Sequence, residues 1–72
     1  MNDRERIGKR IAELRKEKNM TAEDLAAKTG LQRPNISRIE SGRYSTGLDI
    51  LSKIAEALDC RIDFVSNEEL TQ

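Results

Sequence analysis

The fold of this chain is decided by residues 20–42, which read MTAEDLAAKTGLQRPNISRIESG. Thr21 is a favourable N-cap, and Asp24 can bond back to the Thr21 backbone, as in a capping box. Leu25 then opens a narrow apolar stripe of the kind that packs a helix onto a core. Gly30 readily takes the left-handed conformation that ends a helix. The first half of the stretch therefore predicts a short helix between Thr21 and Gly30.

The second half predicts another short helix, which starts at Gln32 or Arg33 and stops at Gly42. Pro34 is tolerated there only because the first turn of a helix has no intrahelical partner for the backbone N–H that proline lacks. The two helices are separated by a very short turn. Residues 20–42 are therefore expected to form a tight helix–turn–helix unit.

The second of these helices has one apolar and one polar side. Ile36 and Ile39 define the buried side. At about 100° per residue, Arg38 points nearly opposite to them and Ser37 lies on the flank. Arg33 lies at the exposed N-terminal tip. Such a helix can pack one face against a small core and present the other to a groove of DNA.

Two further helices are expected around this unit. The first runs roughly from Asp3 to Lys18, where apolar residues recur at i, i+4 and i+7. The other begins after Ser45 or Thr46 and carries an apolar stripe of Leu48, Leu51, Ile54, Ala55 and Leu58.

The segment CRIDFV, residues 60–65, alternates apolar and polar side chains and predicts a β-strand. Nothing else in the chain reads as a partner for it, and a lone strand leaves its backbone groups unpaired. One hypothesis is that it pairs with its copy in a second subunit across a two-fold axis, which would bury Ile62 and Phe64. The alternative is a tail that folds back on its own core.

Composition excludes several functions. Seventy-two residues suffice for one domain, and a single Cys provides neither a disulfide framework nor a zinc site. The chain has no His, no nucleophile–base constellation and no phosphate-binding glycine loop, so we expect no enzyme, no metal and no cofactor. It also has no apolar run long enough to span a membrane and no secretory signal, which favours a cytoplasmic protein.

The net charge is zero, but the charges are unevenly distributed. Residues 1–43 carry eleven Lys/Arg against seven Asp/Glu, a net charge of +4. Residues 44–72 carry two against six, a net charge of −4. The basic excess thus lies in the half that holds the helix–turn–helix unit and would orient that half toward phosphates. Solvated helix faces are the alternative explanation for such charges.

Three strings carry a resemblance to a known family: RIGKRIAELRKEKNMTAEDLAAKTGL, ISRIESGR and LDILSKIAEALD, together spanning residues 6–59. They resemble the helix-turn-helix regulators of the phage repressor and Cro type, also called the xenobiotic-response-element family. The resemblance implies a mostly α, compact lambda-repressor-like bundle of four helices, to which the strand prediction adds a C-terminal β-strand. The expected domains are a DNA-binding domain over residues 1–59 and a dimerisation segment with an acidic tail over residues 60–72.

The same resemblance implies the site. The base-reading positions of the family fall on Arg33, Pro34, Ser37 and Arg38, with Asn35 and Gln32 as secondary candidates. The phosphate contacts are expected from the start of the first motif helix and from the loop after the second, at Thr21, Ala22, Arg43, Tyr44 and Ser45. Ala22 stands where many relatives have Gln, so only its backbone amide remains available. A structural ion pair is implied between Arg15 and Glu40.

The leading expectation is a sequence-specific regulator of transcription, a repressor that binds a palindromic operator in double-stranded DNA as a homodimer on the cytoplasmic nucleoid. The alternative is the antitoxin of a toxin–antitoxin pair, which would bind a toxin protein and repress its own operon. The short acidic C-terminal segment is compatible with such a protein partner.

Overall fold

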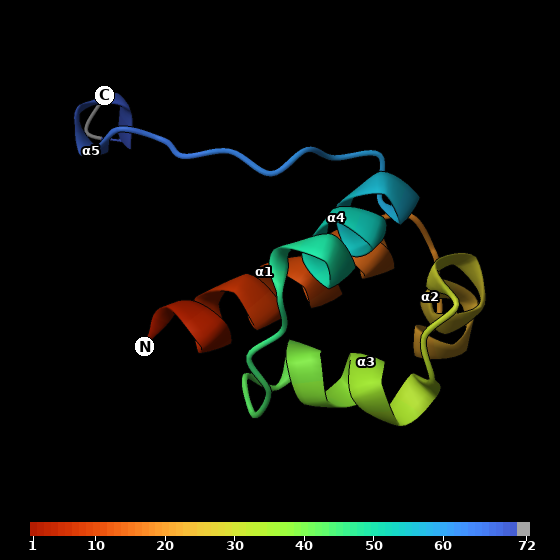
Figure 1. Cartoon of the computed structure of the whole chain (residues 1–72). Helices are drawn as coiled ribbons and strands as arrows, with labels where there is room; N and C mark the ends of the chain where they lie inside the picture. Colours follow the sequence, from red (N-terminus) through yellow and green to blue (C-terminus); the bar gives the residue numbers. More distant parts are fainter. Residues whose placement is uncertain (71–72) are drawn as a thin grey trace.

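The computed structural model describes residues 1–70, which contain five α-helices (Figure 1). The first four form the body of the molecule and correspond to the helices expected from the sequence. The fifth is a single turn at the end of the chain. Their bounds are Asp3–Glu17 for α1, Ala22–Thr29 for α2, Arg33–Glu40 for α3, Leu48–Ala57 for α4 and Asn67–Leu70 for α5.

Capping boxes start the first two helices, and the one at Thr21 is predicted from the sequence. The Asn2 side chain accepts from the Glu5 backbone N–H at 2.9 Å. At α2 the Thr21 hydroxyl accepts from the Asp24 N–H at 3.0 Å, and the Thr21 N–H donates to the Asp24 carboxylate at 2.8 Å. Gly30 ends α2 in the left-handed conformation, with φ of 73°. Local sequence therefore sets where these helices begin and end.

The core lies between the four helices, where α1 packs on α3, α3 on α2 and α2 on α4. Leu25, Ile36, Ile54 and Leu58 are almost wholly buried in it. Thr29 is the buried polar residue, and its hydroxyl donates to the Leu25 carbonyl at 2.8 Å, which satisfies the group inside the core. The complete buried apolar cluster is Ile11, Leu25, Ala26, Ile36, Ile39, Ile54 and Leu58.

A glycine sets the distance between α1 and α3. Gly8 is buried, and a β-carbon there would meet the backbone carbonyl oxygens of Ile39 and Glu40 well inside van der Waals contact. Any larger residue would therefore push the C-terminal end of α3 away from α1. Gly8 places the end of α3 against the first helix.

The predicted C-terminal β-strand is wrong. Residues 60–66 have no regular secondary structure, the short helix α5 follows them, and residues 1–70 contain no strand. Ile62 is half exposed and Phe64 is fully exposed, so neither is buried within the single chain. The physical reason is that a strand needs a neighbour for its N–H and C=O groups, and alternation cannot supply one.

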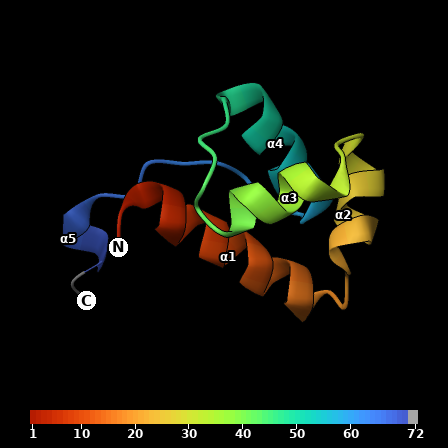
Figure 2. The same cartoon turned by 90° about the horizontal axis from the view of Figure 1, so that it is seen from below.

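We refer to residues 60–70 as the C-terminal arm. It leaves the end of α4 and runs clear of the body in Figure 1, whereas in the view of Figure 2 it passes behind the helices and ends near the N-terminus. The last two residues of the predicted tail, 71 and 72, lie outside the described part of the chain.

Candidate nucleic-acid interface

Helices α2 and α3 form the helix–turn–helix unit expected from residues 20–42. The turn between them is closed by the Leu31 N–H, which donates to the Ala26 carbonyl at 3.2 Å. Leu25 and Ile36 are buried between the helices. Figure 2 looks onto α3, which lies across the front of the bundle. Helix α3 therefore packs on the body through one face and lies at the surface of the molecule.

The outer face of α3 carries the side chains that the sequence assigned to base reading. Ile36 and Ile39 face the core, at 1% and 4% exposure. Six residues around them are all exposed to solvent: Gln32, Arg33, Pro34, Asn35, Ser37 and Arg38. The structure thus brings these six together on one surface that a flat or convex partner can reach.

Arg38 is oriented by a neighbour on its own helix. Its Nη1 donates to the Asn35 Oδ1 at 3.2 Å. Three residues separate the two, so they lie one above the other on the same face of the helix. This bond leaves other guanidinium N–H groups of Arg38 for a ligand, and bidentate donation from a guanidinium suits the O6 and N7 of guanine.

Arg33 faces an acid that sequence reasoning missed. Its Nε lies 3.7 Å from the Glu23 Oε1, and both side chains are mostly exposed. Glu23 belongs to the first turn of α2, so the pair joins the N-terminal ends of the two motif helices. An acid one residue after Ala22 was a usable signal, because the helix–turn–helix geometry places both N-termini on one surface.

The N-terminus of α2 holds two of the residues predicted to contact phosphate, Thr21 and Ala22. The capping box uses the N–H of Asp24, while those of Ala22 and Glu23 have no acceptor within the helix. The helix dipole adds a partial positive charge there. Hydrogen bonds from the Thr21 backbone, and to a lesser extent from its side chain, lower the pKa of the Asp24 carboxyl below 3.8. Asp24 is thus ionised at neutral pH and fixes this end of the helix.

The loop after α3 supplies the remaining candidates for phosphate contact. Arg43, Tyr44 and Ser45 are all exposed. The Arg43 N–H donates to the Arg38 carbonyl at 3.0 Å, so the start of the loop is fixed to α3. Gly42 makes the turn possible, with φ of 77°. The start of the loop is therefore held at the end of α3, while Tyr44 and Ser45 line a pocket together with the start of α1.

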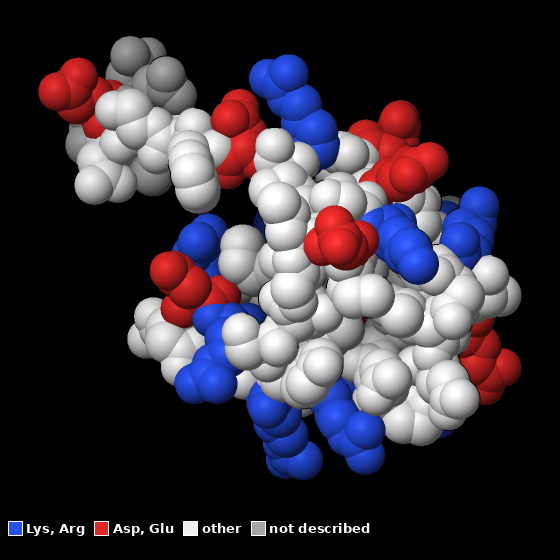
Figure 3. All heavy atoms as spheres, in the orientation of Figure 1, with Lys and Arg blue, Asp and Glu red and all other residues white. Residues whose placement is uncertain are grey.

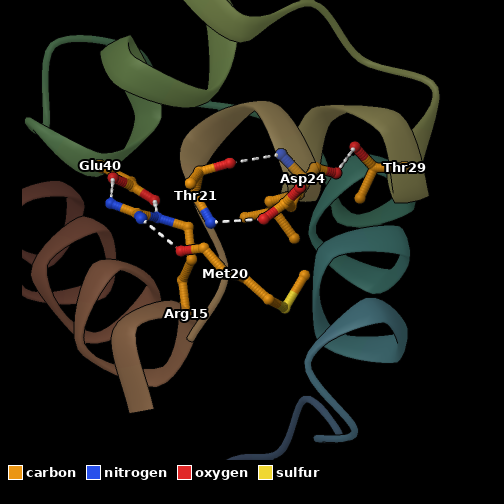
Figure 4. Close-up of polar contacts among 7 residues, drawn as sticks. Arg15, Met20, Thr21, Asp24, Thr29 and Glu40 are labelled. Atoms are coloured by element: carbon orange, nitrogen blue, oxygen red, sulfur yellow. Dashed lines mark hydrogen bonds and ion pairs between the residues drawn. The ribbon is translucent and has the colours of Figure 1, made fainter. Parts of the chain in front are cut away.

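Arg15 and Glu40 form a bidentate ion pair behind this surface (Figure 4). The Arg15 Nε and Nη2 donate to the two Glu40 carboxylate oxygens at 2.7 and 3.1 Å, and Nη1 donates to the Met20 carbonyl at 2.7 Å. Each side chain of the pair is only 13% exposed. The hydrogen bond with Glu40 raises the pKa of Arg15 above its ordinary value. Arg15 thereby ties α1 to the end of α3 and to the residue before α2.

The surface charge follows the same division. Figure 3 shows Lys and Arg side chains along the lower edge of the molecule, below α3, and no acidic side chain at that edge in this view. Most of the acidic groups in view lie higher, toward α4 and the arm. In this view, the charged side chains at the edge below α3 are therefore basic.

Neither a metal cluster nor a membrane span is found in the described residues. No group of three or more His, Cys, Asp or Glu among them is placed to hold a metal ion. None of their helices combines the length and apolar character that a crossing requires.

Comparisons with known proteins agree with this geometry. The chain is 39% identical over 62 residues to an uncharacterised HTH-type transcriptional regulator of Archaeoglobus fulgidus, a match that covers 83% of this chain and 87% of the relative. It is 36% identical over 63 residues to the immunity repressor protein of Bacillus phage phi105, covering 88% of this chain but only 44% of the repressor.

Among solved structures, the restriction-modification controller protein C.AhdI from Aeromonas hydrophila superposes with a TM-score of 0.80 at 36% identity, covering 82% of this chain and 89% of that one. The family model described as helix-turn-helix matches residues 11–65, which include α2, α3, α4 and part of the arm. The chain therefore belongs to the helix-turn-helix family, as a transcriptional regulator and not an enzyme.

Proposed function

We propose that this regulator is a repressor that recognises a palindromic operator in double-stranded DNA as a homodimer, with α3 inserted into the major groove. The observation that carries the proposal is the division of α3: Ile36 and Ile39 are buried while Arg33 and Arg38 are exposed on the opposite side. The similarity to a phage immunity repressor supports repression, and the match to the helix-turn-helix family supports DNA binding.

Each exposed group on α3 has a chemical role in base reading. Arg38 donates to guanine, positioned by Asn35, and Arg33 reads a second base at the helix tip. Ser37 contributes a hydroxyl that donates or accepts, and Pro34 contributes an apolar contact with a thymine methyl group. Gln32 precedes the helix and reaches an adjacent base or phosphate.

Phosphate contacts flank these base contacts and set the register of the helix in the groove. One set comes from the Thr21 hydroxyl and the Ala22 amide at the start of α2. The other comes from Arg43, Tyr44 and Ser45 in the loop after α3. Two anchored sets on either side of α3 hold it at a fixed depth, because the distance between them is fixed by the fold.

A palindromic operator has two half-sites, so two copies of the chain are needed to read it. One α3 contacts only a few base pairs, and two copies related by a two-fold axis read half-sites about 34 Å apart on one face of B-DNA. We propose that the second copy is contacted through Ile62 and Phe64, which are exposed in the single chain. Residues 1–59 then bind DNA and the arm joins the copies, on the nucleoid in the cytoplasm.

Selection of bound duplexes from a random pool tests the proposal directly. The expected result is a palindromic consensus whose half-sites are centred about one helical turn apart. Arg38→Ala is expected to relax the preference at one position of each half-site, with a loss of about 1–3 kcal/mol of discrimination there. Recovery of no consensus would refute sequence-specific binding, and a uniform loss with Arg38→Ala would assign Arg38 to phosphate.

The antitoxin alternative stays a prediction. Neither the described residues nor the relatives reported above favour it over the repressor.

A further inference from the structure

An apolar groove lies on the side of the body away from the outer face of α3. Helix α1 packs on α3, α3 on α2 and α2 on α4. The groove runs between α1 and α4. It has a volume of about 220 Å³. Its apolar lining comes from Ile7, Ile11 and Leu14 on α1, from Leu51 and Ile54 on α4, and from Leu58, which directly follows α4.

The arm begins at the edge of this groove. The Cys60 N–H donates to the Ala55 carbonyl at 2.8 Å, and Asp59 takes a left-handed φ of 57°, so the end of α4 fixes the direction in which the arm departs. Residues 60–63 line one edge of the groove. From there the arm runs away from the body (Figure 1).

The arm carries a large apolar side chain with nothing to cover it. Phe64 is 101% exposed, and Val65 beside it is 52% exposed. Ile62 is 45% exposed although it lines the groove edge. A fully exposed phenylalanine is unfavourable in an isolated chain, because burial of such a ring is one of the larger favourable contributions that a side chain makes.

We propose that the groove between α1 and α4 receives the C-terminal arm of a second copy of this chain, with Phe64 as the anchor. This inference rests on the homodimer of the proposed function and assigns its contacting surfaces. Each copy offers one arm and one groove, which is the self-complementary pair that a two-fold dimer requires. The phenyl ring fits the space, since cavities of about 150 Å³ already accommodate benzene.

A second copy suits the groove better than the chain's own arm. Residues 60–63 line the edge of their own groove, and the arm beyond them runs away from the body, so Phe64 would enter its own groove only if the arm changed its course. An arm that continues outward reaches a neighbouring molecule without any change in the body.

Charge and buried area both suit an arm as the occupant of the groove. Helix α1, which forms one wall, carries six Lys/Arg against four Asp/Glu, whereas residues 60–70 carry one against three. Arg10 lines the groove itself. Exchange of two arms buries two phenyl rings of about 150–250 Å² each, together with the exposed parts of Ile62 and Val65 and the groove surface that they cover.

Sedimentation of the full chain and of three single variants tests the exchange. Phe64→Ala removes the anchor, and Ile7→Gln places a polar group in the groove without changing the helix. Each is expected to weaken the dimer at least tenfold. Leu48→Ala is the matched control, because Leu48 is 65% exposed on α4 but lies outside the groove, and it is expected to leave the dimer unchanged.

Mixing Phe64→Ala with Ile7→Gln tests whether the arms are exchanged between two copies. An equal mixture pairs the intact arm of the Ile7→Gln chain with the intact groove of the Phe64→Ala chain, so dimer is expected to reappear in part. A mixture no better than either variant overturns the proposal, and so does an unchanged Phe64→Ala dimer. Melting temperatures of the monomers give a further test. If monomeric Phe64→Ala melts at a lower temperature than the monomeric wild type, the proposal is overturned, because the ring then packs on its own chain.

The same samples keep this inference distinct from DNA reading. A dimer that shows the expected variant behaviour but selects no DNA sequence overturns the repressor proposal and leaves the exchange standing. If instead a palindromic consensus is selected, and Phe64→Ala binds it equally well as an unchanged dimer, the exchange of arms is overturned and the repressor proposal stands.

Discussion

At the scale of single residues, the ion pair of Arg15 and Glu40 illustrates how a part-buried charge stabilises the fold. Two hydrogen bonds join the side chains, and a third joins Arg15 to the Met20 carbonyl. With both side chains 13% exposed, neither partner regains full hydration if the other is lost. Their contribution is therefore best measured by removal of one charge.

Glu40→Gln is expected to lower the free energy of unfolding by about 3 kcal/mol, because the Arg15 charge loses its partner. In a domain of this size that corresponds to a fall in melting temperature of roughly 12–24 °C by thermal denaturation. Glu13→Gln is the control, since Glu13 pairs with Arg10 at 3.4 Å on an exposed surface. Equal melting temperatures for the two variants would show that the buried pair contributes little.

Glu23 is expected to affect the affinity for DNA, because its Oε1 lies 3.7 Å from the Nε of Arg33. Glu23→Gln frees the Arg33 guanidinium and removes a negative charge beside the N-terminus of α2. Affinity for random-sequence DNA is expected to rise two- to fivefold, the factor that corresponds to an exposed ion pair worth about 0.4–1 kcal/mol.

Fluorescence anisotropy at fixed salt measures the change. Glu56→Gln, an exposed acid on α4, controls for the loss of one negative charge anywhere on the molecule. An equal gain in both variants would mean that the Glu23–Arg33 contact has no specific effect.

At the scale of elements, sequence was a good guide to helices and a poor guide to the arm. Caps and glycines act through bonds within four residues, so the start of α2 at Thr21 and its end at Gly30 followed from the local sequence. The alternation of residues 60–65 also has a local period, but a strand exists only when another segment pairs with it. That partner is absent among residues 1–70, and the segment is an irregular arm.

The capping box of α2 predicts a dependence on acid. The pKa of Asp24 is lowered from 3.8 in the folded chain, so the unfolded chain binds the proton more readily. The carboxylate therefore stabilises the fold above about pH 4, and this stabilisation disappears as the pH falls through the lowered pKa. Asp24→Asn is expected to destabilise the protein at pH 7 and to show a shallower loss of stability below pH 4.

Melting temperatures between pH 2 and pH 7 test this dependence. Asp49→Asn is the control, because Asp49 lies in the first turn of α4, where the N-cap makes no side-chain bond. Parallel pH curves for the wild type and Asp24→Asn would contradict the assignment to Asp24.

At the scale of the whole molecule, the arrangement of charge matters more than its sum. The net charge is zero, yet Lys and Arg side chains line the edge below α3 in Figure 3. Binding to DNA is therefore expected to weaken steeply with salt, because each phosphate contact releases counterions. The slope of log affinity against log salt counts those contacts.

Arg43→Ala tests the arrangement. Arg43 is exposed in the loop beside α3, and its loss is expected to weaken binding to all sequences alike and to reduce the salt slope by about 1. Lys53→Ala, an exposed base on α4, is expected to leave the slope unchanged. A change of base preference with an unaltered slope would place Arg43 among the base-reading residues instead.

The sequence by itself determined the four helices of the body, the apolar faces that meet in the core and the family, because each depends on local periodicity, on capping or on a motif of fixed spacing. Tertiary structure alone decided the contact of Gly8 with the end of α3, the pairing of Glu23 with Arg33, the groove between α1 and α4 and the irregular course of the arm. These features join segments distant in sequence, and their geometry is set by how the helices pack together.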